Sequence, residues 1–393
     1  MNPSASGWVK KVLNHLKDDQ AYLEHDEHAF YEALKASGFI YGSNVMLIED
    51  SIDAQDLTEE ELGKVNLLLA LKYVHSTHAV TTNFVFSVID FYKAINAHKV
   101  SVFEELLGFR KSASLLEKII NKRVHIDDNI VAKSFNYFVI NALLFIDILA
   151  YQTFLKTGHI SFTYIESIEA TIDAIVCKVI ASKPHKTKYD FGLIKLFESS
   201  LRYHDNTKTA YSEVIKDITL DLEKKYLVDI VCMASWTDKI IDQREMKFLN
   251  ELQQDLSLPE AIISTSINDI NAFYSSHKDK ITFLNSKNLI QSFYDNSSQL
   301  VNKLIKRNRK RLTTELKESK EVMRLLSQST SRKLTDDEQK QIQNQLLDIF
   351  KSIPSLAIFM LPGGMLLLPL FIKFIPKLLP SAFDDNRIQE QQN

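Results

Sequence analysis

The 393-residue sequence contains few glycines, prolines and cysteines, and these shortages exclude several kinds of site. With nine glycines it has no G-x-x-x-x-G-K-[ST], G-x-G-x-x-G or G-x-S-x-G loop, which excludes the common phosphate loops and the nucleophile elbow. An H-E-x-x-H zinc motif is also absent. The two cysteines, Cys177 and Cys232, lie in apolar helical patterns and suit small buried side chains in a reducing compartment. We therefore expect a protein that is not an enzyme and has no resident cofactor.

Charge and the N-terminal segment indicate where the protein resides. Charged residues make up 25% of the chain and apolar residues 45%, as in ordinary globular proteins. The net charge of -3 gives no reason to expect DNA as a partner. The first residues lack the apolar core of a secretory signal, and Trp8, Val12, Leu13 and Leu16 instead share one helical face. We expect the protein to be made and kept in the cytoplasm.

Apolar residues recur with helical periodicity almost throughout, and no run alternates as a strand does, so we predict an all-α fold. Thr58 and Glu61 form a capping box at the start of one predicted helix. A second box, Thr335 and Glu338, starts an amphipathic helix that runs toward residue 353. The apolar run 134–155 is predicted to be a buried helix rather than a membrane span, because it contains four polar side chains: Asn136, Asn141, Asp147 and Gln152.

Length and changes in composition predict several domains. The polar, basic stretch SKPHKTKYD contains the first proline after Pro3 and is the predicted boundary between two helical domains. The predicted order is an N-terminal helical domain (1–182), a linker (183–190), a second helical domain (191–300), basic and amphipathic helices (301–352), an apolar segment (353–383) and a polar tail (384–393).

A helical hairpin is predicted over residues 226–258, with Asp238, Asp242 and Glu245 in its turn and at the start of its second helix. The pattern resembles the tellurite-resistance B (TerB) domain, whose hallmark is a D-x-x-x-D-x-x-E turn. Lys239 stands where that family usually has a glycine. Two hypotheses remain open for the three carboxylates: they cap the second helix, or they form a weak divalent-cation site or contact a basic partner.

A strongly basic stretch, KLIKRNRKRL, follows this region. It is either a solvated helix face or a contact for an anionic surface, such as lipid headgroups or RNA phosphates. Its six basic residues are Lys303, Lys306, Arg307, Arg309, Lys310 and Arg311.

The apolar segment near the C-terminus contains no charge between residues 353 and 372, enough for a helix to cross the hydrocarbon core of a bilayer. Its prolines and paired glycines oppose an uninterrupted helix. A kinked span, a re-entrant hairpin and packing into the protein's own core therefore remain open. The positions that mark the segment are Pro354, Pro362, Gly363, Gly364, Pro369, Lys373, Pro376 and Pro380.

The spacing of these prolines, with Lys373 and the LPSAF that follows, resembles the transmembrane segment of the leucine-zipper/EF-hand-containing transmembrane (LETM) family. The whole arrangement is similar to LETM-related, biofilm-associated proteins of Bacteroidetes-type bacteria. The resemblance implies membrane attachment and links to cation balance and ribosome contact. It differs in three respects: no EF-hand loop occurs, no acidic residue lies within the apolar stretch, and we expect no ribosome-binding domain after Pro380.

From these features we predict a membrane-associated, LETM-like interaction or scaffold protein at the cytoplasmic face of a bacterial inner membrane. Its predicted partners are the membrane and the ribosome. The alternative is a soluble helical interaction module whose apolar C-terminal run packs in its own core.

Overall fold

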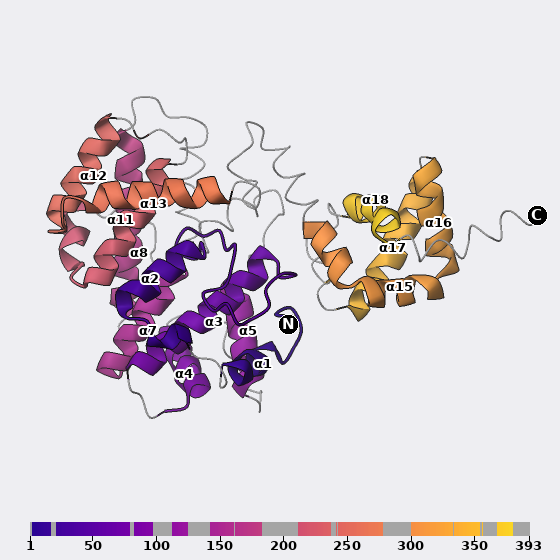
Figure 1. Cartoon of the computed structure of the whole chain (residues 1–393), viewed down its shortest axis with the longest axis horizontal. Coiled ribbons are helices and arrows are strands. Elements are labelled where there is room, and N and C mark those ends of the chain that lie inside the picture. The colour runs from indigo at the N-terminus through magenta and orange to yellow at the C-terminus, as the bar shows by residue number, and fades with distance from the viewer. Residues whose placement is uncertain are drawn as a thin grey trace, which may run out of the picture.

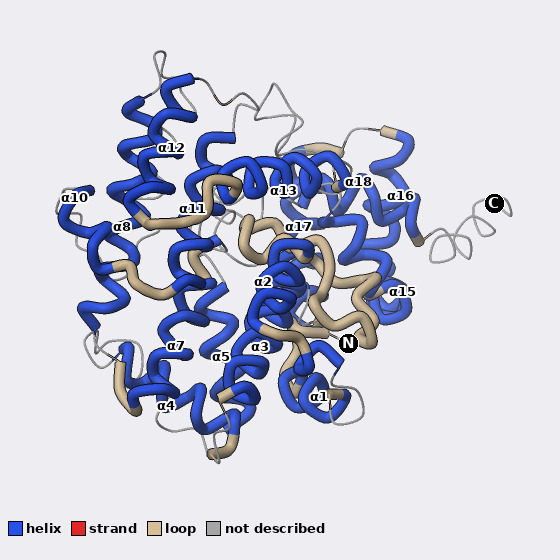
Figure 2. Tube along the Cα trace, turned by 60° about the vertical axis from the view of Figure 1, so that its left-hand side comes forward, coloured by secondary structure: helices blue, strands red, loops and turns tan. Residues whose placement is uncertain are grey.

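The computed structural model describes residues 2–16, 21–78, 82–96, 112–124, 142–160, 162–182, 211–236, 241, 243–277, 300–332, 334–353, 356 and 368–379. Throughout these ranges the regular elements are helices, and none is a strand, which confirms the all-α prediction (Figures 1 and 2). The buried apolar residues form two separate clusters, one between Trp8 and Tyr274 and one between Val301 and Leu379. We call these parts the N-terminal lobe and the C-terminal lobe.

The N-terminal lobe is a bundle whose helices range from one turn to several. Its elements are α1 (Trp8–His15), η1 (Ala21–Glu24), α2 (Glu27–Ala36), α3 (Glu59–Thr77), α4 (Phe84–Asn96), α5 (Ser112–Val124), α7 (Phe145–Thr157), α8 (Phe162–Ser182), α10 (Tyr211–Val214), η4 (Ile215–Asp217), α11 (Asp221–Trp236), α12 (Gln243–Asp255) and α13 (Ile262–Ser276).

Helix α3 runs through the centre of the N-terminal lobe and is buried on nearly all sides. Its predicted capping box is present: Thr58 Oγ1 accepts the Glu61 N–H at 3.3 Å, and Glu61 Oε2 accepts the Thr58 N–H at 3.0 Å. Cys232 on α11 is also fully buried, and burial raises the pKa of its thiol to about 12. These properties support the predicted role of Cys232 as a small buried side chain.

The two helical regions predicted for residues 1–182 and 191–300 share one hydrophobic core. Tyr226 on α11 donates to the Ala142 carbonyl at 2.7 Å, and Tyr31 on α2 donates to Asp229 on α11 at 2.8 Å. The predicted linker, 183–190, lies outside the described residues, so the predicted boundary stays a prediction.

The C-terminal lobe lies to one side in Figure 1 and consists of a helical segment, 300–307, followed by α15 (Arg309–Glu318), α16 (Lys320–Ser331), α17 (Asp336–Ser352) and α18 (Leu368–Leu378). The second capping box, Thr335 with Glu338, is present at the start of α17. The predicted apolar face of that helix is buried, which confirms it as an amphipathic helix; its residues are Ile342, Leu346, Ile349 and, just beyond the helix, Ile353.

Helix α18 contains part of the predicted membrane segment and packs on the C-terminal lobe. Phe371 is fully buried, and its ring lies edge-on to that of Phe350 on α17, with 4.7 Å between centroids. Pro369 occupies the first helical turn, where its missing N–H costs little, and Pro376 lies within the last turn. No described helix combines the length and the apolar character that a membrane span requires. Other marked positions lie outside the described residues, namely Pro354, Pro362, Gly363, Gly364 and Pro380.

Candidate functional site

The two lobes carry charges of opposite sign. Residues 300–379 contain 15 Lys and Arg against 7 Asp and Glu, whereas residues 1–299 contain 31 against 40. The net charge of -3 therefore conceals a basic C-terminal lobe joined to an acidic N-terminal one. A basic surface of this kind attracts anionic partners, and the attraction weakens as salt rises.

The structure divides the predicted basic cluster into two groups. Within segment 300–307, three apolar residues (Val301, Leu304 and Ile305) face the core of the C-terminal lobe. Lys303 and Arg307 lie one turn apart, and each donates a hydrogen bond to the N-terminal lobe. The other four side chains of the cluster are exposed: Lys306, Arg309, Lys310 and Arg311. Lys303 is exposed as well, so Arg307 is the one member of the cluster that is partly buried, and the predicted surface for an anionic partner stays a prediction.

The contact between the lobes centres on Arg307 and Glu61. Their side chains form an ion pair that is almost fully buried, with 10% of the Arg307 side chain and 3% of the Glu61 side chain exposed. Beside it, Lys303 Nζ donates to the Leu57 carbonyl at 3.0 Å. Sequence reasoning missed this contact, because its partners are 246 residues apart and their pairing depends on how two helices meet.

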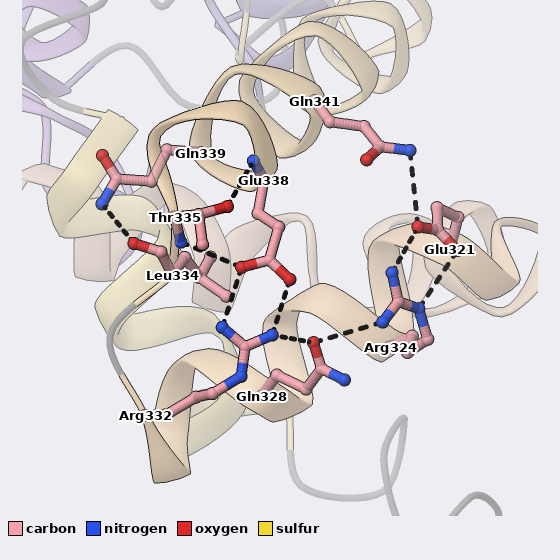
Figure 3. Close-up of polar contacts among 9 residues, drawn as sticks. All are labelled: Glu321, Arg324, Gln328, Arg332, Leu334, Thr335, Glu338, Gln339 and Gln341. Atoms are coloured by element: carbon pink, nitrogen blue, oxygen red, sulfur yellow. Dashed lines mark hydrogen bonds and ion pairs between the residues drawn. The ribbon is translucent and has the colours of Figure 1, made fainter.

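A second polar network joins α16 to α17 (Figure 3). Arg332 donates two hydrogen bonds to the carboxylate of Glu338, at 2.8 and 2.6 Å, and a third to the Gln328 side chain at 2.8 Å. Arg324 pairs with Glu321 in the same two-bonded manner, at 3.2 and 2.7 Å, and also donates to Gln328 at 3.3 Å. Such forked arginine–carboxylate pairs fix orientation as well as distance.

Glu338 has two tasks in this network, since it closes the α17 capping box and receives Arg332. The bonds from Arg332, with those of the capping box, lower the pKa of Glu338 to about 2. A lowered pKa means that this carboxylate stabilises the fold above its ordinary pKa of 4.5. The contribution is lost as pH falls from that value toward 2.

The predicted helical hairpin is present as α11 and α12, but the structure tests its predicted cation site only in part. Glu245 is 1% exposed and lies in the first turn of α12, the position expected of a carboxylate that stabilises a helix N-terminus. Asp238 and Asp242 lie outside the described residues. Across the part of the chain that is described, no three His, Cys, Asp or Glu side chains are grouped as a metal site requires.

Comparison with known proteins shows which family the end of the chain resembles. Residues 334–393 match the sequence model of a family described as LETM1-like, RBD. The match contains α17, α18 and the proline-punctuated segment, so it confirms the LETM part of the sequence resemblance. Only thirteen of the matched residues follow Pro380, so the expectation that no ribosome-binding domain follows that proline stays a prediction.

One curated protein is similar over a short stretch. The mitochondrial proton/calcium exchanger protein of Drosophila melanogaster is 40% identical over 74 residues, which is 19% of this chain and 7% of the fly protein. This chain therefore spans only a small fraction of that protein. No solved structure matches the chain.

Proposed function

We propose that the LETM1-like C-terminal lobe is an interaction module that binds the ribosome through its exposed basic side chains. The observation that carries this proposal is the match of residues 334–393 to a ribosome-binding domain within a lobe of strongly positive charge. Ribosomal RNA presents a dense array of phosphates, which Lys and Arg neutralise at close range. The N-terminal lobe is then a scaffold that carries the module, and neither lobe is proposed to catalyse a reaction.

Replacing four exposed basic residues together tests this proposal: K306Q/R309Q/K310Q/R311Q. We expect the variant to bind purified bacterial ribosomes at least about tenfold more weakly, in co-sedimentation at low salt. The slope of log affinity against log salt should also fall in magnitude by about 3, because each lost phosphate contact removes nearly one released counterion.

A matched control removes four exposed lysines from the N-terminal lobe, as K10Q/K11Q/K156Q/K247Q. It changes the net charge equally but leaves the C-terminal lobe intact. Ribosome binding that falls equally in both variants would reflect total charge and would contradict a specific surface on this lobe.

A second candidate function is attachment to the cytoplasmic face of a bacterial inner membrane. It is favoured by the charge-free run of residues 353–372, of which only Ile353, Leu356 and 368–372 are described. An apolar anchor beside a basic patch would supply two membrane signals. Roles in cation balance or biofilm formation would follow from such a location and not from transport by this segment, which contains no titratable group between 353 and 372.

Replacing residues 357–367 with a Gly-Ser linker of equal length tests attachment while keeping α18. If the run is an anchor, the wild-type protein will remain in the membrane pellet after an alkaline carbonate wash, and the linker variant will be released. If the wild-type protein is also released by carbonate, it has no integral anchor.

A further inference from the structure

The contact between the two lobes is polar in character, unlike the interior of either lobe. The buried apolar residues of the N-terminal lobe and those of the C-terminal lobe form separate clusters that do not merge in the described residues. What joins them near α3 is the Arg307–Glu61 pair and the bond from Lys303 to Leu57. A polar contact of this kind can open without the loss of a shared core, because little apolar surface is exposed.

Glu61 is shared among several donors. Its Oε1 atom accepts the Ser4 hydroxyl at 2.6 Å, and its Oε2 atom accepts both the Thr58 N–H at 3.0 Å and Arg307 Nη1. Burial alone would raise the pKa of Glu61, but the bonds and charge of Arg307, with the bonds from Ser4 and Thr58, hold it below its ordinary value of 4.5. The carboxylate is therefore charged at neutral pH and already has partners within its own lobe.

Arg307 is less well satisfied than Glu61. Only its Nη1 atom is bonded, to Glu61 and, at 3.5 Å, to the Asp56 carbonyl. Its Nε and Nη2 atoms are buried and have no acceptor among the described residues. Guanidinium groups bind carboxylates and phosphates best through two parallel bonds, and a phosphate has free oxygens for both. An RNA phosphate could therefore bond Arg307 more completely than Glu61 does.

We propose that the start of α3 is an internal competitor for the RNA-binding surface: Glu61 holds Arg307 until an RNA phosphate displaces it, and the lobes separate on binding. This inference rests on the proposed function and adds its regulation. Arg307 then belongs to the same surface as its neighbours Lys306 and Lys310, and the N-terminal lobe lowers the affinity of that surface. Coupling between two such events is reciprocal, so RNA must loosen the contact between the lobes to the same extent.

The substitution E61Q tests the proposal with little damage to the fold, because glutamine also completes a capping box with Thr58. The variant removes the negative charge opposite Arg307. We expect it to bind a short poly(U) RNA about fivefold or more tightly than the wild-type protein, and with a salt slope steeper by about 0.7. In the absence of RNA, the amides in 303–308 should exchange faster in E61Q than in the wild-type protein. In the wild-type protein, the same amides should exchange faster once RNA is added.

Glu60 supplies the matched control, since it lies in the same helical turn but pairs with Lys64 at 2.7 Å. E60Q removes the same charge and should leave RNA affinity unchanged. The double variant E61Q/R307Q should lose the gain seen with E61Q, because the released group is absent. Equal affinities of E61Q and wild type would overturn the proposal, as would exchange rates in 303–308 that neither E61Q nor RNA alters.

Different experimental outcomes would refute this inference and the proposed function. If ribosome binding depends on the four exposed basic residues but E61Q has no effect, or poly(U) does not bind, only the competition is refuted. If the wild-type protein and E61Q both fail to bind ribosomes at low salt, the proposed function fails and the inference fails with it.

Discussion

D147A is expected to destabilise the N-terminal lobe by about 3–5 kcal/mol, because it removes one partner of a buried ion pair. Asp147 on α7 is 1% exposed and accepts Arg123 Nε from α5 at 2.6 Å, with a second bond from Arg123 Nη2. Tyr92 on α4 donates its hydroxyl to the same carboxylate at 2.8 Å. Without Asp147, a nearly buried guanidinium and a buried hydroxyl would both lose this acceptor. The apolar helix predicted over 134–155 thus contains a carboxylate with a specific structural role.

Urea unfolding followed by tryptophan fluorescence measures this effect, because both tryptophans, Trp8 and Trp236, belong to the N-terminal lobe. The control D90A breaks an exposed ion pair between Asp90 and Lys93, at 3.2 Å, and should cost less than about 1 kcal/mol. Replacing the whole buried network by apolar residues, as Y92F/R123M/D147L, should restore much of the stability. A loss below about 1 kcal/mol in D147A would mean that Arg123 finds another acceptor in solution.

F371A is expected to destabilise the C-terminal lobe by about 3–5 kcal/mol, the usual cost of removing a buried aromatic ring. Phe371 is fully buried beneath α16 and α17 and contacts Phe350, although it lies inside the predicted membrane segment. Tryptophan fluorescence would not report this loss, since the C-terminal lobe has no tryptophan. Hydrogen exchange of the amides in 320–353 would report the loss, and the exchange rates should rise by about 100-fold or more.

K373A is the control on the same helix, because Lys373 is exposed and should change stability by less than about 0.5 kcal/mol. Unchanged exchange in F371A would show that α18 leaves the lobe in solution. That outcome would favour insertion of the apolar segment into a membrane, whereas the expected outcome places its last third in a protein core.

Local signals in the chain predicted much of the fold. The capping boxes of α3 and α17 involve residues three positions apart, and the face of α17 that includes Ile342 and Leu346 follows from helical periodicity. Packing contacts between distant residues could not be predicted in this way. Gly7 precedes α1 and has no side chain to cap it, so Glu117 on α5 accepts the Gly7 N–H at 2.9 Å and the Val9 N–H at 3.2 Å.

In the candidate site, too, some features were predicted from the sequence and others were not. The basic composition of residues 303–311 was evident in the sequence, and the LETM resemblance of the segment that follows was confirmed by the match to residues 334–393. Which basic side chains face solvent was not evident, because burial depends on the elements that pack against each face of a helix. The structure assigns Arg307 to Glu61 and leaves Lys306 exposed, although the two are adjacent in the chain.

By itself, the sequence determined the helical class, the starts of α3 and α17 and the separation of charge between the two parts of the chain. These properties depend on residue type and on spacings of a few residues, which are local. Only the tertiary structure decided that α18 packs against Phe350 and that Glu61 pairs with Arg307. Both contacts join residues distant in the chain, and their geometry exists only once the helices have packed.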